Sequence, residues 1–164
     1  MVGEMNKQVF QPSKSKVGDM DAKWMILIAY FGAVVLGFIS GAQFLSWLIP
    51  LIVYLIDKEN KFIAFHAMQA FLMAVTATVI YIILAIIMAI SIVGAATSAA
   101  FALNPYAFGA SFGAIMAITA IIVIVGVIIL IFSILAVIKG FKYEIYEVPL
   151  WGKWAEKIVF KTSK

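Results

Sequence analysis

Charged residues are confined to three short segments of this 164-residue chain, and their placement strongly constrains the fold. All twelve lysines and all eight acidic residues fall within residues 1–23, 57–61 and 139–164. The intervening stretches 24–56 and 62–138 carry no charged side chain. Apolar stretches of this kind are typical of segments that lie in the hydrocarbon of a lipid bilayer. The sequence therefore predicts an integral membrane protein.

The composition supports a membrane protein and excludes several other classes. Hydrophobic residues make up 65% and charged residues 12% of the chain, against about 45–50% and about 25% in soluble domains. The absence of cysteine excludes disulfides, thiolate metal sites and a thiol nucleophile. The net charge of +4 comes from lysines that flank the apolar stretches, so anionic lipid headgroups explain it better than nucleic acid does. We expect one compact membrane domain and no nucleic-acid partner.

The hydrophobic pattern and the turn residues predict an all-α, polytopic four-helix membrane bundle. The expected transmembrane domain covers residues 23–140, between a polar N-tail at 1–22 and an interfacial C-tail at 141–164. Its predicted helices are 23–39, 44–56, 62–93 and 112–139. The first two are shorter than the roughly 20 residues that a span needs, so they form a short hairpin that either crosses a thinned bilayer or returns within it. The last two are long enough to cross.

The number of crossings between the charged segments predicts the orientation of the protein. Whether the first two helices cross or return, the N-tail and the loop at 57–61 lie on one side of the bilayer. Two further crossings bring the C-tail back, so all twelve lysines share one face. By the positive-inside rule this face is cytoplasmic. We expect a multi-pass protein of the cytoplasmic (plasma) membrane with both termini on the cytoplasmic side.

Small residues recur at four-residue spacing from the first predicted helix into the turn after it, and again around the start of the last predicted helix. Such residues let transmembrane helices approach closely where lipid supplies no hydrophobic force between them. The residues are Ala33, Gly37, Gly41, Gly109 and Gly113. We interpret them as contacts within one bundle; the seam of a homodimer is the alternative.

A polar stripe enters the membrane from the charged side at the start of the third helix. His66, Gln69 and Thr76 fall along one helical face, and an ionisable group near membrane depth is a functional candidate. We treat them as a candidate polar groove, with structural packing of His66 as the simpler alternative. Asp57 and Glu59 are the only acidic residues nearby, and this set does not form a metal site.

The C-tail interleaves aromatic and charged residues. Tyr and Trp prefer the headgroup level of a bilayer because each has an apolar body and a polar tip. The residues of interest are Tyr143, Tyr146, Pro149, Trp151 and Trp154. We expect an interfacial anchor whose last part, residues 151–160, lies along the membrane as an amphipathic helix. A docking surface for a partner is the alternative.

No arrangement of residues indicates catalysis. General acid–base chemistry needs paired titratable groups, and neither long uncharged stretch contains a carboxylate or a lysine. Glycine-rich phosphate loops and zinc-ligand spacings are also absent from the sequence. We therefore predict a protein that is not an enzyme and has no cofactor and no metal.

Short motifs in the chain resemble a known family. Residues 65–70 read Phe-His-Ala-Met-Gln-Ala and follow a Pro-Leu-Ile segment at 50–52 and a polar Asp-Lys-Glu loop at 57–59. The tail supplies Gly140, Tyr143, Tyr146 and Pro149. Over about residues 20–155, this pattern resembles the small four-helix membrane proteins related to the twenty-kilodalton subunit of the chloroplast inner-envelope protein translocon. The resemblance implies a four-helix membrane fold and a role in preprotein translocation.

These observations lead to one preferred function and two alternatives. We expect a non-enzymatic membrane protein that acts in a complex with other membrane subunits and assists protein translocation or insertion. One alternative is a small-molecule, lipid or ion binding or transport protein with its groove at His66 and Gln69. The other is a scaffold that recruits a partner through the C-tail. The lipid bilayer is a partner in each case, and a homo-oligomer is left open.

Overall fold

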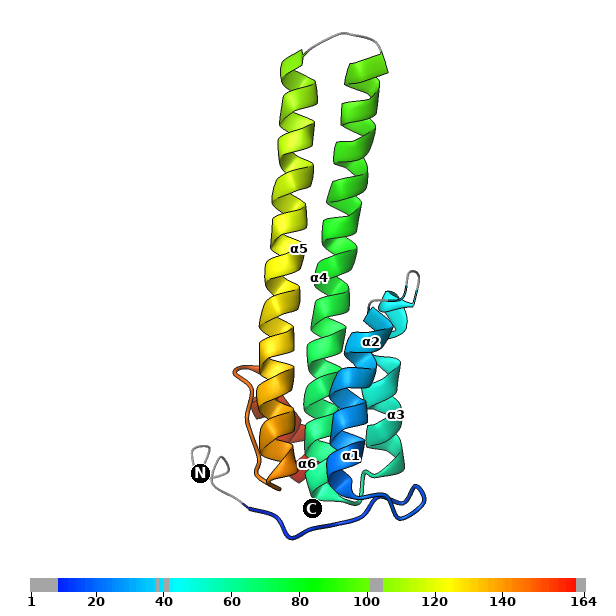
Figure 1. Cartoon of the computed structure of the whole chain (residues 1–164), viewed down its shortest axis with the longest axis vertical. Helices are drawn as coiled ribbons and strands as arrows, with labels where there is room; N and C mark the ends of the chain where they lie inside the picture. The colour runs from blue at the N-terminus through cyan, green and yellow to red at the C-terminus, as the bar shows by residue number, and fades with distance from the viewer. Residues whose placement is uncertain (1–8, 38, 40–41, 101–104, 162–164) are drawn as a thin grey trace. The chain divides into compact units, whose positions relative to one another are not determined.

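The computed structural model describes residues 9–161 apart from 38, 40–41 and 101–104 (Figure 1). Within these residues the chain is all-helical and contains no β-strand, only isolated bridges that join Val9 to Glu144 and Lys14 to Asp21. The predicted all-α class is confirmed. The chain divides into two compact units. Unit 1 comprises Met1–Thr78 and Ile129–Lys164, and unit 2 comprises Val79–Ile128.

The first apolar segment of unit 1 is a nearly continuous short helix. It consists of α1 (Ala22–Leu27), a π-helical turn η2 (Ile28–Gly32) and α2 (Ala33–Gly37). Asp21 caps the beginning of α1 by accepting a hydrogen bond from the backbone N–H of Lys23, as aspartate commonly does at this position.

A second short segment returns along the first. It comprises η3 (Gln43–Leu45) and α3 (Leu48–Ile56). A Cβ atom added at Gly32 would lie 2.9 Å from Cγ2 of Ile49. The missing side chain of Gly32 therefore lets α3 pack directly against η2.

Two long apolar helices follow, α4 (Lys61–Ala100) and α5 (Pro105–Phe141). They confirm the prediction of two long helices but continue beyond the expected bounds, because most of the stretch 94–111, which we interpreted as a connection, is helical. Alanine favours helix, and proline is tolerated at a first helical position, where Pro105 lies. In the most apolar 18-residue part of each helix, only 6% of α4 and 17% of α5 is buried against the rest of the chain. Exposed apolar helices of this length suit a lipid environment.

The core of unit 1 surrounds the first part of α4. The side chains of Tyr30, Phe62 and Phe65 are each at most 2% exposed. The end of α5 approaches α1 closely, since a Cβ atom at Gly140 would lie 3.0 Å from Cγ2 of Ile26. The core thus joins the short hairpin to the beginning of α4 and the end of α5.

Unit 2 consists of parts of α4 and α5 with exposed aliphatic side chains. A Cβ atom at Gly126 would lie 3.4 Å from the hydroxyl of Tyr81, and one at Gly94 would lie 3.2 Å from that of Ser111. The Thr119 hydroxyl donates to the Ile115 carbonyl of its own helix at 2.9 Å. This hydroxyl is therefore satisfied within its helix, as hydrocarbon requires.

Three of the glycines expected to mediate helix packing make no close contact with another described element. A Cβ atom added at Gly37, Gly109 or Gly113 would meet no described atom within 4 Å. The helices approach at other glycines instead, which removes the need for the expected contacts. Ala33 is half-buried, and Gly41 lies outside the described residues. The homodimer seam stays a prediction.

Candidate functional site

The polar stripe of α4 binds the extended first part of the C-tail. The Nε2 atom of Gln69 donates hydrogen bonds to the Tyr30 hydroxyl at 2.8 Å and to the Tyr146 carbonyl at 3.1 Å. Its Oε1 atom accepts a bond from the Val148 backbone N–H at 3.1 Å. Gln69 therefore pairs with the peptide groups on both sides of Glu147, much as a neighbouring β-strand would pair with them.

The C-tail stays against α4 as far as Thr76. The indole N–H of Trp151 donates to the Thr76 hydroxyl at 3.0 Å, and that hydroxyl donates to the Leu72 carbonyl at 2.8 Å. Trp151 begins α6 (Trp151–Lys161), directly after the turn that contains Pro149. A Cβ atom at Gly152 would lie 2.7 Å from Cα of Glu147. Only glycine fits at this position without displacing its neighbours.

His66 lies in an aromatic enclosure. Its ring is fully buried, and its centroid lies 5.0 Å from that of Phe62, 5.5 Å from that of Phe65 and 6.2 Å from that of Tyr30. The backbone of Glu144 interacts with the ring, but neither ring nitrogen has a partner with hydrogen-bond geometry among the described residues. His66 therefore contributes to packing in this conformation.

The predicted polar stripe lies on one side of α4, and the C-tail covers it. His66 and Gln69 are buried, and the C-tail occupies the side of α4 on which we expected an open groove. A groove was expected because the sequence does not show that a segment more than 70 residues away docks there. The predicted C-tail residues follow the same docking. Tyr143, Tyr146 and Trp151 are half-buried, whereas Trp154 is 56% exposed.

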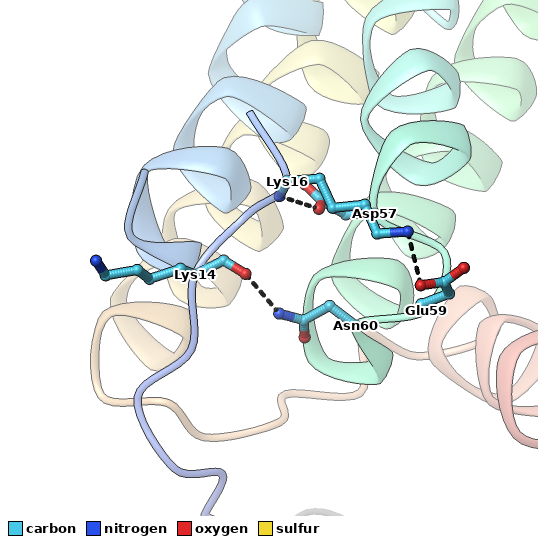
Figure 2. A network of polar contacts seen from close by, with 5 residues as sticks. All are labelled: Lys14, Lys16, Asp57, Glu59 and Asn60. Carbon is cyan, nitrogen blue, oxygen red and sulfur yellow. Dashed lines mark hydrogen bonds and ion pairs between the residues drawn. The ribbon is translucent and has the colours of Figure 1, made fainter. Parts of the chain in front are cut away.

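The N-tail docks at the same end of the bundle, on the loop between α3 and α4 (Figure 2). Asp57 is 1% exposed and accepts hydrogen bonds from the Ser15 hydroxyl and, at 2.8 Å, from the backbone N–H of Lys16. The Asn60 amide donates to the Lys14 carbonyl at 3.3 Å. The bonds from Ser15 and Lys16 satisfy the Asp57 carboxylate, which would otherwise be buried without a partner.

One ion pair adds to this contact at the surface. Nζ of Lys16 lies 2.6 Å from Oε2 of Glu59, and the lysine lowers the pKa of the Glu59 carboxyl. Both side chains are well exposed, so the pair adds little stability. The buried Asp57 is therefore the main polar anchor of the N-tail.

The two tails also contact each other. The backbone N–H of Phe10 donates to the Tyr143 carbonyl at 2.8 Å, and the Phe10 ring stacks on Phe62. The Tyr143 hydroxyl donates to a carboxylate oxygen of Asp21. This bond raises the pKa of Tyr143 to about 12 and lowers that of Asp21. The described parts of all three charged segments thus meet at one end of unit 1.

Sequence reasoning missed Ser15, Asp57 and Gly152 as docking residues. Asp57 was considered as a metal ligand and as part of a polar loop, but not as a docking residue. The described residues contain no group of three His, Cys, Asp or Glu side chains placed to hold a metal ion. The uncharged Gly152 between Trp151 and Lys153 was the one available signal, because glycine within an amphipathic helix often marks a close approach.

These features define an all-helical, membrane-associated protein whose tails dock on its own bundle. The sequence profile of the MamF/MmsF family, the magnetosome magnetite crystal formation protein family, matches residues 21–155. The chain therefore belongs to this family. Neither a curated protein nor a solved structure matches it.

The family match corrects the resemblance drawn from short motifs. The profile that covers residues 21–155 is that of the magnetosome family, so the expected relation to the chloroplast translocon subunit was wrong, and a role in translocation is not supported. The motif residues serve local packing instead. Gln69 pairs with the C-tail, and Tyr143 bonds to Asp21. Motifs that solve a packing problem identify a family poorly.

Proposed function

We propose that this chain is a membrane subunit of the magnetosome that supports magnetite crystal formation without catalysing a reaction. The family match over residues 21–155 carries this proposal. The exposed apolar surfaces of α4 and α5 support a multi-pass membrane protein. The short hairpin of α1, α2 and α3 completes a four-helix bundle in this proposal, since residues such as Ile52 and Leu55 also expose apolar side chains.

The proposal orients the charged end of unit 1 toward the cytoplasm. The positive-inside rule favours this orientation, because all twelve lysines lie in the three segments that contain the docked tails and loop. In this orientation the described residues 94–100 and 105–111 face the interior of the compartment in which the crystal grows. The stretch 94–111 has hydroxyl, amide and aromatic side chains but no charge.

This orientation favours action through membrane and protein contacts over direct iron binding. Iron sites in proteins commonly use carboxylate and imidazole ligands. Residues 62–138 contain no carboxylate, and their single imidazole, that of His66, is enclosed by aromatic rings in unit 1. We therefore propose that the protein acts with other magnetosome membrane subunits at its cytoplasmic end.

The test uses a magnetite-forming bacterium that lacks its own family member. Expression of this chain should change the number or size of crystals seen by electron microscopy, and the protein should be recovered with the crystal-containing membranes. Gln69→Leu, which removes the bonds to the C-tail, should weaken the effect at equal protein level. The paired change Tyr106→Phe and Ser111→Ala, which removes hydroxyls from the opposite stretch, should preserve it. Unchanged crystals with the wild-type chain would refute the proposal.

A further inference from the structure

The C-tail runs along α4 from its beginning, near Phe62, as far as Thr76, and then returns toward the beginning of the helix. On the inward path, Tyr143 lies against Phe62, and Trp151 bonds to Thr76. On the return path along α6, the Phe160 ring lies 6.2 Å from that of Phe65. The first fifteen residues of α4 rise about 22 Å. Helix α6 therefore runs back along the beginning of α4.

Exposed apolar side chains lie on α3, at the same level of unit 1 as α6. The Trp47 ring contacts that of Phe71 on α4, so α3 extends from the level of Phe71 back to the loop that begins at Asp57. Along this length Ile52 is 52% and Leu55 57% exposed. Apolar exposure of this degree on a membrane protein indicates contact with acyl chains. The inner end of α6 thus reaches a depth at which the bundle meets lipid.

The two faces of α6 differ sharply. Gly152, Ala155 and Val159 are buried against the bundle, and the ammonium group of Lys61 donates to the Val159 carbonyl at 3.0 Å. These contacts fix the rotation of the helix. The opposite face exposes basic and aromatic side chains, namely Lys153, Trp154 and Lys157.

We propose that α6 is a slanted, partly inserted helix that binds anionic phospholipid headgroups through Lys153 and Lys157. An exposed tryptophan beside the two lysines matches the boundary between acyl chains and headgroups. Lysine stems can lie along apolar surface while their ammonium groups reach lipid phosphates. The three lysines and one glutamate of α6 give it a positive charge that complements such lipids. This binding surface goes beyond the proposed role in crystal formation and does not depend on it.

The test exploits the absence of cysteine from the native chain. A bimane fluorophore is attached to Trp154→Cys in full-length protein reconstituted into vesicles of phosphatidylcholine and phosphatidylglycerol. In matched samples, one lipid or the other carries brominated acyl chains. We expect brominated phosphatidylglycerol to quench severalfold more strongly than an equal fraction of brominated phosphatidylcholine. The same fluorophore at Lys58→Cys, on the exposed loop, should be quenched weakly by both.

The double change Lys153→Gln and Lys157→Gln tests the role of charge. Both side chains are exposed, so we expect the fold to be retained and the preference for phosphatidylglycerol to disappear while quenching by both lipids persists. Equal quenching by the two lipids with the native lysines would overturn the proposal. A fluorophore at position 154 that behaves like the one at position 58 would also overturn it.

Discussion

Gln69 shows how one uncharged side chain can hold distant segments together in an apolar environment. Its amide bonds to Tyr30 on the first hairpin and to the backbone at Tyr146 and Val148 on the C-tail. A buried amide without partners would cost about 1–3 kcal/mol. Because both its nitrogen and its oxygen are bonded, Gln69 can lie in the core and still specify how the C-tail docks.

Gly152 provides a prediction at the scale of a single methyl group. In Gly152→Ala the new Cβ would lie 2.7 Å from Cα of Glu147 and 2.9 Å from Oε1 of Gln69. We expect overpacking to destabilise the protein by about 1–3 kcal/mol, measured as a lower apparent melting temperature in detergent. Gly37→Ala is the matched control, because its Cβ would meet no described atom within 4 Å. Equal effects of the two changes would contradict the docking of the C-tail.

The sequence predicted the stripe but not its partner. His66, Gln69 and Thr76 were placed on one helical face from their spacing alone, because an α-helix has a fixed period. Gln69 and Val148 are 79 residues apart, and no local pattern encodes their contact. Aromatic enclosure of His66 likewise depends on Tyr30, which lies on a different helix. Local periodicity therefore revealed the residues, whereas tertiary packing determined what they do.

At the scale of elements, the contact between the N-tail and the C-tail should depend on pH. Asp21 accepts a bond from Tyr143, which lowers the pKa of Asp21 below its usual 3.8. A carboxyl group with a lowered folded pKa stabilises the fold above its unfolded pKa, and this stabilisation is lost as the pH falls through the folded value. The contribution should therefore be present at neutral pH and decline progressively as the pH falls below about 4.

Tyr143→Phe tests this dependence. At pH 7 we expect the variant to be less stable by about 0.5–1.5 kcal/mol, the usual contribution of a hydrogen bond. The difference from wild type should close as the pH falls below the Asp21 pKa, as measured from melting temperatures in detergent. Tyr54→Phe is the control, since no hydrogen bond joins the Tyr54 hydroxyl to a described residue, and it should show no such pH dependence. A difference that stays constant from pH 7 to pH 3 would refute the assigned role of Asp21.

The helix bounds show a different limit of prediction. The charge-free stretches correctly indicated two long helices, because membrane segments are defined by composition over many residues. The residues at which these helices begin and end were harder to predict. Gly94 and Ser111 indicated a connection, but α4 continues to Ala100 and α5 begins at Pro105. Small residues tolerate helix and turn alike, so composition alone does not determine where a helix ends.

At the scale of the whole molecule, contacts made by the two tails bring the charged segments to one end of unit 1. The N-tail bonds to the loop at Asp57, and the C-tail bonds to the N-tail through Tyr143. These contacts hold the described parts of the three charged segments together in unit 1. The charged end is therefore held together by contacts between the two tails and the loop at 57–61.

The resulting topology can be tested with single cysteines in this cysteine-free chain. Lys14 and Lys58 are exposed on the charged segments, and Tyr106 is 88% exposed near the beginning of α5. A membrane-impermeant maleimide added to intact magnetosomes should label Lys14→Cys and Lys58→Cys, whereas Tyr106→Cys should require detergent. In spheroplasts, protein that remains in the plasma membrane should show the opposite pattern. Labelling of positions 58 and 106 from the same side would mean that α4 does not cross the bilayer, and labelling of positions 14 and 58 from opposite sides would contradict the docked N-tail.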